Sequence, residues 1–353
     1  AGARRRATTR RRARAARRAD PANRARGRLT QMDTRPPLRL AFLGCGLAAR
    51  MHARTLRRFR GEALCYFASR RPGVAWEHAR RYGGAGAFDS YEAALADPRI
   101  DAALVLTPPA LHLEWTERAL AAGKHVIVEK PAFPRTADFD RAAEAAARAG
   151  RQVLVAENYA YKPALARLRE IIESGALGDI LFLHVNALKH QRTGDWRDDP
   201  ALAGGGALLE GGVHWIHFMG ALGLTIESAS GARPGTAHGN EKSVLVTLRY
   251  REGAVGTLAY SWEVHSPLHG LRLSRIYGTR GGIAFESNGL VIAVHGSKHA
   301  LHLPALTDPA GYRAMFRDLL DALREGREGR VTLERARRDV ELVEQVYRSL
   351  EEA

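Results

Sequence analysis

Short apolar runs alternate with amphipathic segments along the first half of the chain. The runs have the length and composition of buried strands and occupy 38–43, 63–68, 102–106, 125–128 and 153–156. Between them, Ala, Arg and Glu recur at helical spacing over 47–60, 74–82, 109–122 and 136–149. Strands that alternate with helices predict a parallel sheet with right-handed crossovers. We therefore predict a doubly wound α/β domain that binds a nucleotide, over residues 37–157.

The pattern changes after residue 157. A helix is expected near 163–174, a strand near 180–189, and a helix that follows the glycines at 204–206 and extends to about 222. Strand-like runs then follow one another at 225–231, 242–251, 254–262, 271–277 and 281–286. Strands in succession with short turns predict an antiparallel meander. Two helices, near 310–325 and 332–351, complete a second α/β domain over residues 158–353.

The positive charge is concentrated at the N-terminus. The chain has a net charge of +16, of which residues 1–31, with twelve Arg and one Asp, carry +11. Few large apolar residues and many like charges predict that residues 1–36 are disordered. Met32 stands where a start codon would be expected, so we interpret the segment before it as a mis-assigned start or an inert arm. The alternative, an arm that binds nucleic acid, rests on this charge alone.

Two further features of the composition bear on location. The two cysteines, Cys45 and Cys65, give no disulfide framework and fit a reduced, cytoplasmic protein. No uninterrupted apolar run approaches the roughly 20 residues that span a membrane. We expect neither a membrane nor a nucleic acid as a partner.

A glycine loop follows the first predicted strand and opens a helix. Gly44 permits a tight turn, Gly46 lets the backbone approach a pyrophosphate, and Ala49 allows close packing of helix on strand. The helix start at Leu47 and Ala48 supplies free N–H groups for the phosphates. This context favours a dinucleotide-binding loop of Rossmann type over a turn without a ligand.

The end of the second strand decides between the two nicotinamide cofactors. NAD selectivity usually needs an acidic residue there, and the chain has none between Glu62 and Glu77. Instead it has Ser69, Arg70 and Arg71, whose hydroxyl and guanidinium groups suit a 2′-phosphate. NADP is therefore favoured over NAD, the alternative being that these arginines are solvated surface.

A lysine ends the strand at 125–128. Ligands of open parallel sheets bind beyond the carboxyl ends of the strands, so Glu129 and Lys130 should border the cofactor cleft. Pro131 restricts the backbone of the lysine before it. A lysine amine in such a cleft can exchange a proton with a hydroxyl group. Tyr159, which follows the run at 153–156, should line the same cleft.

Glu210, His214 and His217 are spaced to share one face of a helix. Gly211 and Gly212 cost that helix about 1 kcal/mol each, which usually marks a close approach by another backbone or a ligand. A catalytic carboxylate–histidine pair is the favoured interpretation. A metal site and a core helix with hydrogen-bonded histidines remain alternatives.

Taken together, these segments resemble the family of glucose–fructose oxidoreductase, inositol dehydrogenase and rhizopine-catabolism proteins (Gfo/Idh/MocA). The family's Ala-Gly-Lys-His-Val-x-x-Glu-Lys-Pro stretch matches residues 122–131, and its Trp-Arg followed by a glycine-rich segment matches residues 196–214. The likeness covers about residues 37–350. It implies a Rossmann domain followed by an α/β domain with an open, largely antiparallel sheet.

The resemblance also implies site residues. Lys130 would be the acid/base, and His214 would position the substrate hydroxyl. The loop with Thr107, Pro108 and His112 would line the nicotinamide side of the cleft. Trp196 and Arg197 would contribute to the cofactor site. The family usually has Asp where this chain has Glu210, and often a second Asp where it has His217.

We therefore predict a dehydrogenase or reductase that uses NADP, or NAD, and acts on a secondary alcohol or ketone of a sugar, cyclitol or related polyol. Lys130, His214 and Glu210 would be catalytic, and Tyr159 and His217 would join the latter two in binding substrate. We expect no metal, and a homodimer or homotetramer. The alternatives are a glycosidase of the same family that uses its nicotinamide transiently, and a non-catalytic sensor of a sugar or nucleotide.

Overall fold

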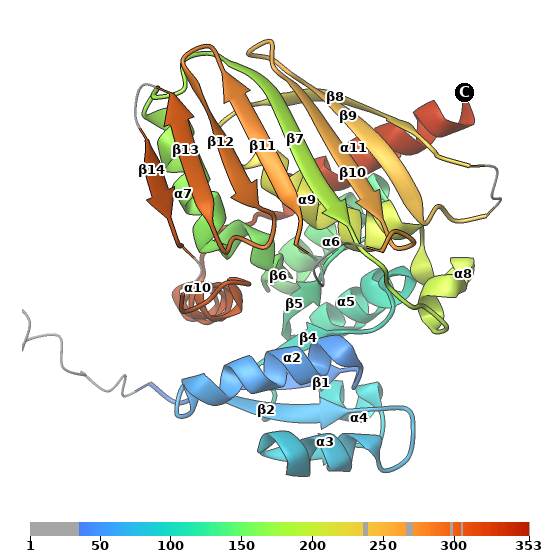
Figure 1. The fold of residues 1–353 in the computed structure, drawn as a ribbon. Coiled ribbons are helices and arrows are strands. Elements are labelled where there is room, and N and C mark those ends of the chain that lie inside the picture. The colour runs from blue at the N-terminus through green and yellow to red at the C-terminus, as the bar shows by residue number, and fades with distance from the viewer. Residues whose placement is uncertain (1–34, 236–238, 266–270, 297–298, 305, 353) are drawn as a thin grey trace, which may run out of the picture. The chain divides into compact units, whose positions relative to one another are not determined.

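Two sheets organise the chain (Figure 1). The computed structural model describes residues 35–352, except 236–238, 266–270, 297–298 and 305. The predictions for residues 1–34 therefore lie outside the described residues. Both sheets belong to one compact unit, Leu38–Ala353.

The first sheet is parallel, with the strand order β3-β2-β1-β4-β5-β6. This order reverses between β1 and β4, which opens a crevice at the carboxyl ends of these two strands. The strands are β1 Leu38–Leu43, β2 Ala63–Ala68, β3 Gly86–Phe88, β4 Ala102–Val105, β5 His125–Glu129 and β6 Val153–Ala156. The helices between them are α2 Leu47–Leu56, α3 Val74–Tyr82, α4 Tyr91–Ala96, α5 His112–Ala121 and α6 Thr136–Ala149.

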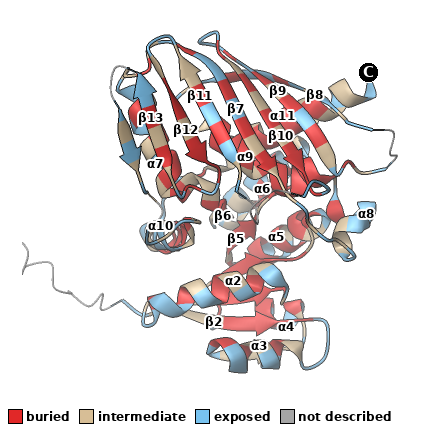
Figure 2. Cartoon of the chain, viewed as in Figure 1, coloured by how far each residue is buried: buried red, intermediate tan, exposed pale blue. Residues whose placement is uncertain are grey.

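The residues of β1, β4, β5 and β6 are buried in unbroken runs, as apolar runs without alternation predict. Every residue of β4 is buried, and so are the last four residues of β1. Figure 2 shows that buried residues also predominate along β2. The prediction omitted β3 and α4. β3 has three half-buried residues, Gly86–Phe88, which is too short a run to show any periodicity.

The second sheet has eight strands in the order β14-β13-β12-β11-β7-β10-β9-β8. The strands are β7 Ile180–Leu188, β8 Ile226–Ala232, β9 Ser243–Tyr250, β10 Val255–Ser261, β11 Leu273–Gly278, β12 Gly281–Glu286, β13 Ile292–Gly296 and β14 Ala300–His302. The helices of this part are α7 Pro163–Glu173, α8 Pro200–Ala203, α9 Val213–Gly220, α10 Tyr312–Glu325 and α11 Leu333–Glu351. The largely antiparallel sheet and the α/β class were predicted.

The expected uninterrupted meander is wrong in one respect. β7 lies between β10 and β11, parallel to β10 and antiparallel to β11. Its position depends on pairing between segments about 70 residues or more apart, which local periodicity does not encode. Burial alternates along β7 and β9, so one face of this sheet packs against the rest of the protein and the other is open.

Side chains from the two halves hold the sheets together. Thr136, which begins α6, donates from its backbone N–H to the Glu344 carboxylate on α11 (2.9 Å). Arg317 on α10 forms a two-pronged ion pair with Glu62 before β2 (2.6 and 2.8 Å). These contacts join the half that carries the first sheet to α10 and α11.

Candidate active site

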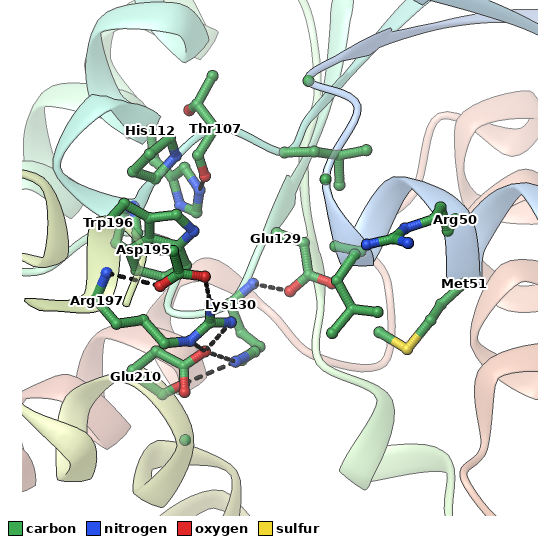
Figure 3. Close-up of a pocket in the computed structure, with 18 of the residues that line it drawn as sticks. Arg50, Met51, Thr107, His112, Glu129, Lys130, Asp195, Trp196, Arg197 and Glu210 are labelled. Atoms are coloured by element: carbon green, nitrogen blue, oxygen red, sulfur yellow. Dashed lines mark hydrogen bonds and ion pairs between the residues drawn. The ribbon is translucent and has the colours of Figure 1, made fainter. Parts of the chain in front are cut away.

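A cavity of about 930 Å³ runs along the carboxyl edge of the first sheet. Its wall is formed by the glycine loop, by the ends of β2, β4 and β5, and by residues of the second half that include Trp196, Glu210 and His214 (Figure 3). All the predicted site residues line it except His217. Those that line it are Gly44, Gly46, Leu47, Ala48, Ser69, Arg70, Thr107, Pro108, His112, Glu129, Lys130, Tyr159, Trp196, Arg197, Glu210 and His214.

The glycine loop has the geometry that a dinucleotide requires. Gly44 has φ +130°, and a Cβ there would lie 2.7 Å from the carbonyl oxygen of Leu106. A Cβ on Gly46 would project into open space, so the backbone is open to a ligand at that point. Helix α2 begins there without a side-chain cap and without an acidic residue in its first turn, which leaves its N–H groups and dipole for phosphates.

The loop after β4 offers a second indication of a ligand. Thr107 is buried, and its hydroxyl has no hydrogen-bond partner within the described part of the chain. His112 fixes the loop from behind, because its ring nitrogens contact the carbonyl oxygens of Thr107 (2.8 Å) and Pro131 (2.9 Å). Complete burial lowers the pKa of His112, and the two carbonyl contacts oppose this shift. The pocket thus fits a nicotinamide dinucleotide.

The end of β2 carries no carboxylate into the cavity. Ser69, Arg70 and Arg71 line it, and the Ser69 hydroxyl accepts a hydrogen bond from the backbone N–H of Arg71 (3.1 Å). The exposed guanidinium of Arg70 lies over the ring of Tyr91, 5.8 Å from its centre.

Lys130 connects the first sheet to the glycine-rich segment. Its Nζ donates to the carbonyl oxygen of Glu210 (2.7 Å) and lies 3.8 Å from the Glu210 carboxylate. The same carboxylate accepts from Arg197 (3.1 and 3.2 Å), whose guanidinium also pairs with Asp195 (2.6 Å). Burial opposes the charge of Glu210, but the two cations outweigh it and lower the pKa of this carboxyl.

The glycines of this segment allow a tight approach, although the partner is a side chain rather than a backbone or ligand. Residues Leu208–Gly212 form a π-helical turn before α9. A Cβ on Gly211 would overlap the hydroxyl of Tyr260 on β10. The π turn displaces the regular helical spacing on which the prediction of one shared face rested.

His214 faces the cavity and has a carboxylate behind it that we did not predict as a site residue. Its Nδ1 lies 2.7 and 2.8 Å from the two carboxylate oxygens of Glu157. Burial lowers the pKa of His214, and the Glu157 charge only partly opposes this shift. A neutral ring then donates from Nδ1 to Glu157 and leaves Nε2 for a substrate hydroxyl. Tyr159 stacks on this ring with 4.4 Å between the ring centres.

Glu157 remains ionised despite being buried. Burial opposes its charge, but His214 and the backbone N–H of Tyr159 lower its pKa to about 2. The sequence did carry a signal, because Glu157 directly follows β6 just as Glu129 ends β5. Glu129 is likewise held by a histidine that was not predicted: its carboxylate lies 2.7 Å from Nε2 of His52 on α2.

His217 points away from the cavity. It is buried, and its Nδ1 lies 2.6 Å from Asp339 on α11, which also pairs with Arg335 (3.2 Å). Within the described ranges, no group of three or more His, Cys, Asp or Glu side chains is arranged to hold a metal ion. The structure thus brings Lys130, Glu210 and His214 together and places His217 between α9 and α11.

A nucleotide loop beneath a lysine and a carboxylate-held histidine defines a dinucleotide-binding oxidoreductase site. The chain belongs to the Gfo/Idh/MocA family of oxidoreductases. Residues 38–157 match the family described as "Oxidoreductase family, NAD-binding Rossmann fold", and residues 165–284 match the "GFO/IDH/MocA C-terminal domain". The predicted family and the predicted nicotinamide dinucleotide are confirmed, while the preference for NADP is not tested by these matches.

Known relatives support the same assignment. A dTDP-3,4-didehydro-2,6-dideoxy-alpha-D-glucose 3-reductase of Saccharopolyspora spinosa is 31% identical over 80% of each chain. The enzyme of the same name from Streptomyces violaceoruber is 39% identical over 39% of this chain, and the match spans only 41% of its own length. The crystal structure of an oxidoreductase from Thermotoga maritima, 28% identical, superposes with a TM-score of 0.77 over 89% of this chain and 96% of that one.

The placement of His217 generates a prediction. Burial opposes its charge, but Asp339 outweighs this and raises the pKa of His217 above 6.5. The charged pair therefore stabilises the fold fully below pH 6.5, and this part is lost as the pH rises through the raised pKa. We expect His217→Gln to lower the melting temperature most at pH 5–6 and less near pH 8, without loss of turnover.

Thermal melts and steady-state rates of wild type and His217→Gln between pH 5 and pH 8 test this prediction. His214→Gln is the matched contrast, since it should reduce turnover. If His217→Gln lowers the melting temperature by the same amount at every pH, His217 does not titrate in this range. A large loss of turnover in His217→Gln would show that His217 contributes to the active site.

Proposed function

We propose that the protein is an NADP-preferring oxidoreductase that transfers a hydride between nicotinamide C4 and a secondary alcohol or ketone carbon of a sugar, cyclitol or related polyol. The observation that carries the proposal is the convergence of Lys130, Glu210 and His214 at the carboxyl edge of a dinucleotide-binding sheet. The relatives named above, which are reductases of a dTDP-linked sugar, support a sugar as substrate.

Separate groups of the chain would bind the cofactor and transfer the proton. Gly44, Gly46, Leu47 and Ala48 would hold the pyrophosphate, and the loop with Thr107 would hold the nicotinamide side. When bound, the nicotinamide ring supplies or accepts the hydride. In ketone reduction the Lys130 ammonium gives its proton to the carbonyl oxygen, and in alcohol oxidation the neutral amine takes the proton back.

Glu210 and His214 would prepare this proton transfer. The Glu210 carbonyl and carboxylate hold Nζ of Lys130 in place, while Nε2 of His214 binds the reacting oxygen. Glu157 fixes the orientation and tautomer of His214 from behind. Tyr159, stacked on His214, would line the substrate side.

The helices, the cysteines and the open face of the second sheet bear on the location and the partners of the protein. None of the described helices is both long and apolar enough to cross a membrane. Cys45 and Cys65 are both free thiols, which suits the cytoplasm. The open face of the second sheet bears Phe182 and Leu273, which are 48% and 52% exposed, and we propose that a second copy of the chain covers it.

Lys130→Ala should lower kcat by roughly 10²–10⁴, the range for loss of a general acid or base. The absorbance of reduced nicotinamide during turnover measures it. Lys130→Arg keeps a cation near Glu210 but holds its proton at all accessible pH values, so it should be about as slow. The exposed Lys242→Ala is the matched control and should retain the wild-type rate. Turnover of Lys130→Ala within a few-fold of wild type would refute the acid/base role.

Arg70→Ala should weaken the binding of NADP and leave the binding of NAD nearly unchanged. The lost charge-assisted hydrogen bond costs about 1.5–3 kcal/mol, or roughly 10- to 150-fold in Kd. Fluorescence titration with both cofactors measures the change. Arg81 lies over Tyr82 just as Arg70 lies over Tyr91, at 5.8 Å, so Arg81→Ala is a matched control without a phosphate to hold. An equal loss for both cofactors would show that Arg70 supports the fold.

Phe182→Asp should separate the proposed dimer, because a charge in the centre of a covered apolar face is costly to bury. Light scattering coupled to gel filtration gives the mass of each species. Leu290, exposed in the turn before β13, provides the control variant Leu290→Asp. A wild-type protein that is monomeric at high concentration would overturn the dimer.

A further inference from the structure

Cations outnumber carboxylates along the cavity wall by eight to three. The three carboxylates already have partners: Glu129 contacts His52, while Glu210 and Asp195 pair with Arg197. Cofactor phosphates account for the arginines near the glycine loop and β2. Lys130 and Arg197 contact Glu210, which leaves three cations from the second half of the chain without such an explanation. Of these, Arg192 is exposed to solvent, whereas Lys189 and Arg272 are half-buried.

Lys189 directly follows β7 and borders the catalytic groups. Its Nζ donates to the side chain of Gln191 (2.5 Å), and among the described residues no carboxylate forms an ion pair with it. Burial, together with repulsion from Lys130 and Arg272, lowers the pKa of Lys189 to about 8, although Glu210 opposes the shift. The carboxylate of Glu210 is shared with Lys130 and Arg197, so Lys189 lacks a counter-charge of its own.

Arg272 precedes β11 and lies over the ring of Trp215, 5.9 Å from its centre. One guanidinium nitrogen donates to the side chain of Asn288 (2.6 Å), whereas the buried Nε has no hydrogen-bond partner in the described structure. Among the described residues no carboxylate forms an ion pair with Arg272, and the Glu286 carboxylate accepts instead from the side chain and backbone N–H of Asn288 (2.9 Å each). The internal segments outside the described residues contain neither Asp nor Glu.

These two cations border the substrate side rather than the dinucleotide loop. Lys189 lies over Tyr260, and Arg272 over Trp215, which neighbours His214 on α9. Both line the same cavity as Lys130. An anion between them would gain charge-assisted hydrogen bonds and relieve the repulsion between like charges.

We propose that Lys189 and Arg272 form a subsite for an anionic group of the substrate, a carboxylate or a phosphate carried by the sugar. The inference rests on the proposed function for the site as a whole, since it names the class of sugar on which that site acts. A sugar acid, a sugar phosphate and a nucleoside diphosphate sugar share the required chemistry. A neutral sugar lacks it.

The test compares each neutral sugar with its uronic acid, its phosphate ester and its nucleoside diphosphate ester, on the full chain with saturating NADP or NADPH. We expect at least one acidic form to have a higher kcat/KM than its neutral parent, mainly through a lower KM. The carboxylate and phosphate arms identify the source of the charge. Equal or better use of the neutral parents throughout would overturn the subsite.

Charge-removing variants make the test specific. Lys189→Gln and Arg272→Gln should each reduce the ratio of kcat/KM for acidic over neutral sugar by roughly 10- to 150-fold. Lys189→Arg and Arg272→Lys keep the charge and should restore much of the ratio, which separates a lost charge from a damaged fold. Lys242→Gln, a surface control, should leave the ratio unchanged. A ratio unaffected by either Gln variant would refute the proposal.

Calorimetric binding of the same sugars to the cofactor-loaded protein separates this inference from the proposed function. Acidic sugars that bind wild type, but bind both Gln variants weakly and are never oxidised or reduced, would support the subsite and refute the oxidoreductase. Turnover without preference for charge would support the oxidoreductase and refute the subsite. Absence of both binding and turnover across the panel would refute both.

Discussion

The contact between Lys130 and Glu210 is the constraint on which the site depends. It joins the end of a parallel strand to a segment 80 residues later, and so defines where the two sheets meet. The backbone carbonyl holds Nζ directly, while the carboxylate, also paired with Arg197, supplies charge 3.8 Å away. A lysine on a flexible stem gains a fixed position in this way, and fixed positions are what proton transfer requires.

Two buried carboxylates at strand ends of the first sheet each contact a histidine. Glu157 directly follows β6 and orients His214, and Glu129 ends β5 and contacts His52. Both acids lie at strand ends of the first sheet, so His214 on α9 is aligned by the domain that carries the glycine loop. The geometry of the site thus relies on the packing between the two halves, including the α10 and α11 contacts that hold them.

The sequence predicted what short-range patterns encode. Apolar runs identified β1, β2, β4, β5 and β6, and the rule that ligands bind at the carboxyl ends of strands placed Lys130 correctly in the cavity wall. Long-range pairing was not accessible, so the insertion of β7 between β10 and β11 was missed. The spacing of His217 from His214 suggested a shared face, but Asp339 on α11 binds His217 on the side of α9 away from the cavity. The same rule about strand ends, applied to β6 as it was to β5, would have predicted Glu157 as a site residue.

The central claim is that one substrate oxygen meets both Lys130 and His214 beside the nicotinamide. A crystal structure of the protein with NADP and a sugar that it oxidises tests this most directly. The account predicts the reacting oxygen within about 3.2 Å of both Nζ of Lys130 and Nε2 of His214. A sugar bound in the cavity with its reacting oxygen in contact with neither group would contradict it.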